Sequence, residues 1–157
     1  NRMMMFGWSY GGYASLIAAA REPQIYQCVI AGATVPDPID QVNYYRSQLN
    51  SQGDSVQAQE QLNMWLDSVS PIEEVEKVNV PMLIVHGDVD QRTPPRAARR
   101  YMEALKEHGK DHKVLWLEGA DHFSNTLFYH HKMELYTAMT DYLANDCFKN
   151  SNKVAQR

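Results

Sequence analysis

The chain has 157 residues, of which 44% are hydrophobic and 22% are charged, and its formal net charge is -4 at pH 7. This length and composition are typical of one soluble globular domain with a sizeable core. The acidic balance argues against a nucleic-acid partner, because proteins that bind nucleic acids usually carry a basic excess, and no apolar run approaches the roughly 20 residues of a membrane-spanning helix.

Four short apolar runs, separated by helical patterns, predict an α/β fold with a mostly parallel sheet. The runs are MMMF (3–6), CVIAGA (28–33), MLIVH (82–86) and VLWL (114–117). Unbroken apolar runs are typical of strands that helices cover on both faces. Cys28 lies in the second run and is expected to be a small buried hydrophobic side chain. Two cysteines do not indicate a disulfide framework.

The first helix is expected over residues 12–20, which are rich in helix formers. The polar stretch of residues 37–69 has no strand pattern. Apolar side chains recur at helical spacing near its end, so we expect at least one helix there. The sequence SPIE at residues 70–73 combines an N-cap, a first-turn proline and a capping-box glutamate, and it predicts the start of a short helix.

Two further helices are expected in the second half of the chain. Thr93 is a favourable N-cap for the first of them, and Gly109 can end it. The buried face of this helix is expected to carry three side chains at helical spacing: Ala97, Tyr101 and Leu105. Its solvated face is expected to carry three arginines: Arg96, Arg99 and Arg100. The last helix is expected over about residues 130–143.

The run GWSYGG, at residues 7–12, follows the first predicted strand and precedes the first predicted helix. It fits G-x-S-x-G, the pattern of a nucleophile elbow, in which a serine lies on a tight turn between strand and helix. The flanking glycines leave room for the strand and the helix to pass closely. The Ser9 hydroxyl then projects beyond the carboxyl end of the strand, and the Tyr10 backbone N–H faces the substrate oxygen. The strand and helix around this pattern make it more specific than the pattern alone.

A serine hydroxyl needs a base to become a nucleophile, and the base needs an acid to orient it. In an α/β-hydrolase these groups follow in the order serine, acid, histidine, after successive strands. Asp88 and Asp90 both follow the third apolar run, and the residue pattern does not decide between them. His122 follows the fourth run. The loops at the carboxyl ends of parallel strands therefore offer a serine, an acid and a histidine, where α/β sheets place their sites.

The other five histidines occupy less distinctive positions. His108 and His112 flank a glycine in a polar turn and are expected to be solvated, whereas His86 is expected at a buried strand end. His130 and His131 begin a helix and are expected to lie at the surface or to be half-buried. These histidines do not share ligand spacing on one element, so neither a metal site nor another cofactor is predicted.

GWSYGGYAS, VPMLIVHGDVDQRTP and WLEGADHF resemble the catalytic domain of the prolyl oligopeptidase family of serine peptidases, over nearly the whole chain. The residues around the serine are most similar to the dipeptidyl-peptidase branch. The resemblance implies an α/β-hydrolase fold with Ser9 as nucleophile and His122 as base. It makes Asp90 the acid, as the last residue of an H-G-x-x-D pattern, and Asp88 a turn residue. The oxyanion donor it implies is the Tyr10 N–H.

The resemblance covers the C-terminal half of the α/β-hydrolase domain of that family. We therefore expect residues 1–157 to be a partial catalytic domain, weakly active or inactive alone, with the upstream half and any propeller outside this chain. A tyrosine hydroxyl that completes the family's oxyanion hole would also lie upstream. The first strand would then be an exposed sheet edge, which favours self-association. No targeting segment is recognised, and the compartment is not indicated.

The expected substrate is a short peptide, with Trp8 and Arg92 as candidate substrate contacts. The alternative for Arg92 is a surface residue that supports its loop. The sequence departs from the family after the second apolar run, where Tyr44 and Tyr45 cannot be matched to the aromatic side chains of a proline pocket. An esterase or other acyl hydrolase with the same triad is one alternative. A non-catalytic interaction domain with this fold is another.

Overall fold

The computed structural model describes residues 3–48, 56–122 and 127–148. Within these ranges four strands form one parallel sheet in the order β1-β2-β3-β4. The strands lie close to the four predicted runs: β1 (Met4–Trp8), β2 (Cys28–Gly32), β3 (Met82–Gly87) and β4 (His112–Leu117). The predicted α/β class with a parallel sheet is therefore confirmed.

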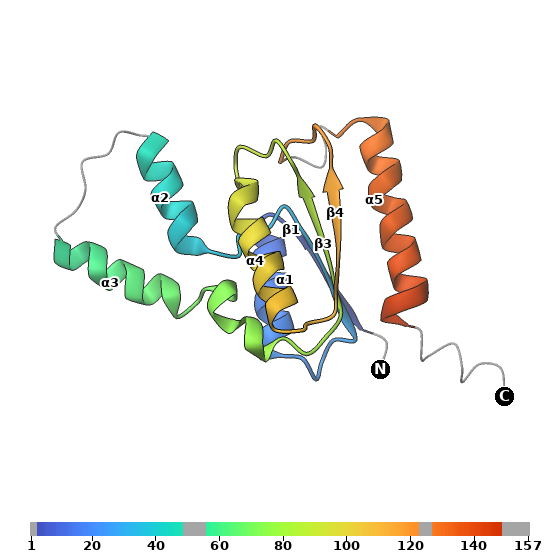
Figure 1. The fold of residues 1–157 in the computed structure, drawn as a ribbon, viewed down its shortest axis with the longest axis horizontal. Helices are drawn as coiled ribbons and strands as arrows, with labels where there is room; N and C mark the ends of the chain where they lie inside the picture. Colours follow the sequence, from blue (N-terminus) through green and yellow to red (C-terminus); the bar gives the residue numbers. More distant parts are fainter. Residues whose placement is uncertain (1–2, 49–55, 123–126, 149–157) are drawn as a thin grey trace.

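Helices flank both faces of this sheet (Figure 1). One face is covered by α1 (Tyr10–Arg21) and α4 (Pro95–Glu107), and the other by α5 (Tyr129–Tyr142), which η2 (Leu143–Cys147) continues. The polar stretch after β2 contains two helices, α2 (Pro38–Gln48) and α3 (Val56–Asp67), followed by the short η1 (Pro71–Lys77). In Figure 1, α2 and α3 project to one side of the sheet. None of the helices in the described part of the chain combines the length and apolar character needed to span a membrane.

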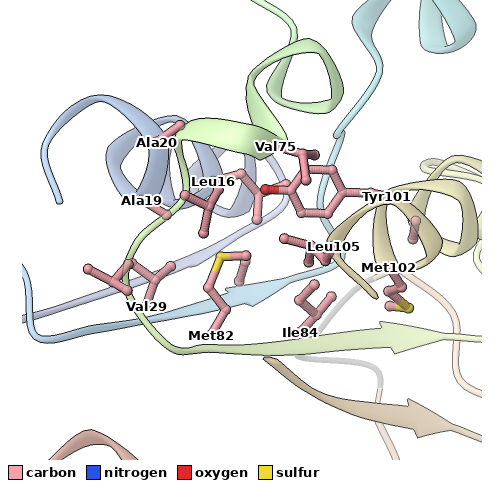
Figure 2. Close-up of a cluster of buried hydrophobic side chains, with 14 residues drawn as sticks. Leu16, Ala19, Ala20, Val29, Val75, Met82, Ile84, Tyr101, Met102 and Leu105 are labelled. Carbon is pink, nitrogen blue, oxygen red and sulfur yellow. The ribbon is translucent and has the colours of Figure 1, made fainter. Parts of the chain in front are cut away.

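The first hydrophobic cluster fills the space between the sheet and the helices α1, α4 and η1. Figure 2 shows Leu16 of α1 and Ile84 of β3 among its side chains. The predicted inner face of α4 is confirmed, because Ala97, Tyr101 and Leu105 are all buried. Burial also raises the pKa of the Tyr101 phenol well above its usual range. This cluster fixes α1, and with it the turn that carries Ser9, on the sheet.

The second cluster lies on the opposite face and holds α5. Leu135 and Tyr142 of α5 pack with Ile30 and Leu83 of the sheet. Within the same cluster Cys28 and Cys147 form a disulfide bond across a sequence separation of 119 residues. The expectation for Cys28 was correct about burial, since it is 0% exposed, and wrong about bonding. The bond ties the first residue of β2 to the last residue of η2.

Two helix starts differ in detail from the sequence-based expectation. Thr93 is not the N-cap of α4, because Pro94 occupies that position and the helix begins at Pro95. The Thr93 hydroxyl donates a hydrogen bond to Asp90 instead. Ser70 does precede η1, but its side chain caps nothing there. Its hydroxyl donates to the carbonyl of Pro36 at 3.4 Å.

The three arginines of α4 are exposed, as predicted, and each also makes a contact that the sequence did not predict. Arg96 contacts Asp40 at 2.9 Å and Arg100 contacts Asp37 at 2.6 Å, which ties α4 to the region of α2. Arg99 places its guanidinium 4.1 Å above the ring of Trp116. Because α2 itself carries no buried residue, these ion pairs and a set of hydrogen bonds described below position it beside the sheet.

Candidate active site

Ser9 lies on a strained turn directly after β1. Its backbone has φ 59° and ψ -118°, a conformation that residues other than glycine rarely adopt. Such strain costs on the order of 1–3 kcal/mol and persists only where the surrounding structure holds it. Here the Ser9 N–H donates to the Gly32 carbonyl at 2.9 Å, and the Ser9 carbonyl accepts from the Tyr13 N–H at 3.0 Å. The elbow geometry predicted from GWSYGG is therefore present.

The two glycines of the motif contribute differently to this turn. A Cβ added at Gly7 would lie 2.0 Å from the carbonyl oxygen of Gly11, so β1 and α1 approach each other too closely for a side chain there. A Cβ at Gly11 would meet nothing within 4 Å. The steric argument from the sequence is thus confirmed for Gly7 and wrong for Gly11.

The carboxyl ends of the strands bring three predicted residues together. Ser9 follows β1, Asp90 follows β3 and His122 follows β4. The Nε2 atom of His122 lies 2.7 Å from Ser9 Oγ, and its Nδ1 atom lies 2.8 Å from Asp90 Oδ2. A carboxylate can only accept hydrogen bonds, so Nδ1 carries the proton of the neutral imidazole. Nε2 is then free of a proton and accepts the hydrogen bond from the Ser9 hydroxyl.

Asp90 is buried, at 2% exposure, and its carboxylate is fully occupied by donors. Oδ1 accepts from the backbone N–H groups of Arg92 and Thr93, each at 2.8 Å. Oδ2 accepts from the Thr93 hydroxyl at 2.8 Å as well as from His122. Burial by itself would raise the pKa of Asp90, but the hydrogen bonds from His122 and Thr93 outweigh it, and the pKa is lowered. The carboxyl is therefore held in its charged form.

The neighbouring Asp88 has a different position, which separates the two acids that the residue pattern left open. Its Oδ1 accepts from the backbone N–H of Gly119 at 2.6 Å and so joins the loop after β3 to the loop after β4. Trp8 makes a second such link, because its indole N–H donates to the His122 carbonyl at 2.7 Å. Trp8 thus holds the backbone of the histidine loop, while its contact with substrate stays a prediction.

Tyr10 is the first residue of α1, and its side chain is exposed. Backbone N–H groups in the first turn of a helix have no acceptor within the helix, and the positive end of the helix dipole lies at the same place. The Tyr10 N–H is therefore suited to stabilise a negative oxygen next to Ser9.

A mainly apolar cavity of about 480 Å³ begins at Tyr10 and extends between α1, α2 and α3. The side chains that line it include Tyr10, Tyr13, Val35, Val42, Trp65 and Leu66. Sequence reasoning did not identify this cavity, because its walls come from three separate segments of the chain.

Three side chains of α2 brace the loop that carries Asp90. Gln41 and Tyr45 donate to the Arg92 carbonyl at 2.6 and 3.0 Å, and Tyr44 donates to the Gln91 carbonyl at 2.8 Å. The two tyrosines that could not be matched in sequence thus direct their hydroxyls to the acid loop. The backbone of Arg92 takes part in this bracing, and a substrate contact of its side chain stays a prediction.

Two further histidines are buried. His86 is 0% exposed, as expected for a strand-end histidine, and donates from Nε2 to the Thr93 carbonyl at 2.8 Å, whereas its Nδ1 atom has no hydrogen-bond partner among the described residues. Burial lowers the pKa of His86. His131 is 2% exposed and donates to the Glu118 carbonyl, so the surface position expected for it is wrong. Over residues 3–48, 56–122 and 127–148, no three His, Cys, Asp or Glu side chains gather in a way that could hold a metal ion.

Comparison with known proteins agrees with the fold. Residues 1–150 match the model of the prolyl oligopeptidase family. The chain is 28% identical over 153 residues to human prolyl endopeptidase FAP, covering 97% of this chain and 19% of that protein. It is 26% identical over 150 residues to pig dipeptidyl peptidase 4, covering 94% and 18% respectively. The chain thus spans about a fifth of the length of these relatives.

Solved structures show the same fold. An acylaminoacyl peptidase of Pyrococcus horikoshii superposes with a TM-score of 0.74 at 18% identity, over 93% of this chain and 24% of that one. Dipeptidyl peptidase 4 of Porphyromonas gingivalis superposes with a TM-score of 0.70 at 23% identity, over 89% and 19%. The four parallel strands correspond to the C-terminal portion of an α/β-hydrolase domain. The family match over nearly the whole chain, with relatives in the dipeptidyl-peptidase branch, leads to one conclusion: the chain belongs to the prolyl oligopeptidase family.

Proposed function

We propose that this chain carries the catalytic triad of a serine peptidase that cleaves short peptides, with Ser9 as nucleophile, His122 as general base and Asp90 as the acid that orients it. The observation that carries the proposal is the continuous relay from Ser9 Oγ through both ring nitrogens of His122 to the Asp90 carboxylate, at 2.7 and 2.8 Å. Membership of a serine peptidase family supports the same assignment.

In the proposed reaction Ser9 Oγ attacks the carbonyl carbon of the scissile bond while its proton passes to His122 Nε2. The charged Asp90 stabilises the imidazolium that forms. The Tyr10 N–H donates to the developing oxyanion, an interaction of a kind worth on the order of 10²–10³ in rate. When the C–N bond breaks, His122 returns the proton to the leaving amine. Water then attacks the acyl-enzyme along the same path, with His122 again as base.

The cavity beside Tyr10 is proposed to receive the substrate side chain next to the scissile bond. Its lining includes Val35, Val42, Trp65 and Leu66, and it offers about 480 Å³ of mainly apolar space. An apolar side chain is therefore favoured over a charged one, because a charge would lose hydration there without gaining a partner.

We also propose that residues 1–157 act as one part of a longer catalytic domain. The support is the coverage of the solved structures, of which this chain matches 24% or less in the two comparisons given above. A second oxyanion donor, and any domain that restricts access to short peptides, would then come from the rest of that longer protein. Turnover by this chain alone is expected to be weak for that reason.

A fluorophosphonate probe tests the proposed nucleophile directly, because it reacts covalently with activated serines and does not need turnover. We expect labelling of Ser9 in the wild-type chain, located by peptide mass mapping, and loss of labelling in Ser9→Ala. The matched control is Ser15→Ala, which removes a neighbouring serine whose hydroxyl donates to the Gly11 carbonyl within α1. A folded chain that remains unlabelled at Ser9 would contradict the proposal and favour a non-catalytic interaction domain.

The esterase alternative differs in substrate and not in nucleophile. A labelled protein that hydrolyses p-nitrophenyl esters and leaves peptide amides intact would establish it, whereas cleavage of a peptide amide with an apolar residue before the scissile bond supports the peptidase.

A further inference from the structure

Thr93 is a residue whose sequence position indicated only a helix cap, yet its side chain lies inside the hydrogen-bond relay. It is buried, at 5% exposure. Its hydroxyl lies 2.8 Å from Asp90 Oδ2, 3.2 Å from His122 Nδ1 and 3.3 Å from the Ala33 carbonyl oxygen. All three neighbours are polar atoms, so the hydroxyl contacts both the acid and the base of the proposed triad.

The chemistry of these neighbours determines where the hydroxyl proton points. A threonine has one proton to donate, and Asp90 Oδ2 is both the nearest acceptor and the charged one, which makes that bond the strongest available. The oxygen of the hydroxyl then faces the Nδ1–H of His122. That hydrogen lies between Asp90 Oδ2 and Thr93 Oγ1, at heavy-atom distances of 2.8 and 3.2 Å.

The backbone of Thr93 is fixed at both polar atoms. Its N–H donates to Asp90 Oδ1 at 2.8 Å, and its carbonyl accepts from Nε2 of the buried His86 at 2.8 Å. Thr93 therefore donates two hydrogen bonds to the Asp90 carboxylate, from its N–H and its hydroxyl, and its own carbonyl accepts a hydrogen bond from His86. A residue with so little freedom can keep the plane of the carboxylate aligned with the imidazole.

We propose that Thr93 is a positioning residue of the Ser9–His122–Asp90 relay, which orients the Asp90 carboxylate toward the imidazole of His122. This inference rests on the proposed function. Thr93 acts through Asp90 and His122 and does not contact the reacting atoms.

Asp90 Oδ2 accepts hydrogen bonds from both Thr93 and His122. Without the Thr93 hydroxyl the carboxylate loses one of its donors, so its alignment with the imidazole of His122 is held less firmly. His86 also faces this carboxylate, with its Nε2 atom 3.7 Å from Oδ2, and burial lowers the pKa of His86.

The test measures the rate of fluorophosphonate labelling of Ser9 in this chain at one fixed pH near neutrality. In this reaction Ser9 Oγ forms a bond to phosphorus, the P–F bond breaks, fluoride leaves, and the serine proton passes to His122 Nε2. Three variants are compared with the wild type: Thr93→Val, which keeps the shape and removes the hydroxyl, Thr93→Ser, which keeps the hydroxyl, and Thr34→Val.

Thr34 is the matched control because it is also buried, at 1% exposure, and its hydroxyl has no hydrogen-bond partner among the described residues. We expect Thr93→Val to lower the labelling rate roughly tenfold. Thr93→Ser is expected to restore the rate, because it keeps the hydroxyl and loses only the methyl group, and Thr34→Val is expected to match the wild type.

Two results would overturn the inference alone: a wild-type labelling rate in Thr93→Val, or a rate in Thr93→Ser as low as that in Thr93→Val, which would assign Thr93 to packing. If Thr93→Val does not fold, as judged by circular dichroism, the smaller Thr93→Ala is compared with Thr93→Ser by the same labelling rate. A folded wild-type chain that is not labelled at Ser9 overturns the proposed function, and this inference with it.

Discussion

Breaking the Cys28–Cys147 disulfide is expected to remove a large part of the free energy of unfolding. The bond closes a loop with a sequence separation of 119 residues. In the chain-entropy description, a cross-link over about 119 residues stabilises the folded state by about 5 kcal/mol at 25 °C, because it restricts the unfolded chain, and measured losses on removal are typically about 2–5 kcal/mol. The total stability of a domain is about 5–15 kcal/mol.

The measurement is urea unfolding followed by circular dichroism, for the oxidised chain, the reduced chain and the double variant Cys28→Ala/Cys147→Ala. With a slope of about 2 kcal/mol per molar urea, a loss of about 4 kcal/mol moves the midpoint down by about 2 M. Reduction acts on this bond alone, because the sequence has two cysteines. The urea midpoint of the single variant Cys147→Ala should fall as far as that of the double variant. Equal midpoints for the oxidised and reduced chains would refute the reasoning.

Two further predictions concern the site. Gly7→Ala should lower the free energy of unfolding by about 1–3 kcal/mol, because the added Cβ overpacks against the Gly11 carbonyl. Gly11→Ala adds a Cβ in open space within α1 and should raise the free energy of unfolding by about 0.5–1 kcal/mol. A higher urea midpoint for Gly7→Ala than for Gly11→Ala would contradict both expectations. The pKa of Asp90 is lowered in the folded chain, so its charge stabilises the fold above the unfolded-state pKa of about 3.9, and this contribution is lost as the pH falls through the lower folded value. Between about pH 5 and pH 2 the free energy of unfolding of Asp90→Asn should therefore fall less than that of the wild type. An equal fall in both proteins would contradict this prediction.

The strands and the three relay residues were predictable because their signals are local. An apolar run followed by a turn places Ser9, Asp90 and His122 at strand ends without knowledge of how the strands pair. Strand order then follows from parallel β-α units, and the carboxyl ends meet at one edge. The choice of Asp90 over Asp88 needed the family pattern, since both aspartates follow the same strand.

What the sequence did not reveal depends on contacts between distant segments. The Cys28–Cys147 pair has no sequence signal. Thr93 fits a helix cap by local preference, but its hydroxyl lies between Asp90 and His122, and His122 comes from a loop 29 residues away. The arginines of α4 are exposed as predicted, but their ion pairs have no sequence signal because Asp40 and Asp37 lie 56 and 63 residues earlier in the chain.

The relay joins residues 32 and 113 positions apart in the chain. Contacts between residues so far apart in the chain have a high entropic cost of loop closure. We therefore expect them to form late in folding, after the sheet that supports them. Ser9 and His122 come from the two outermost strands, β1 and β4, so a folding intermediate with three paired strands cannot hold them together. The nucleophilicity proposed for Ser9 is thus expected only after complete folding, so the serine would be unreactive while the chain is still assembling.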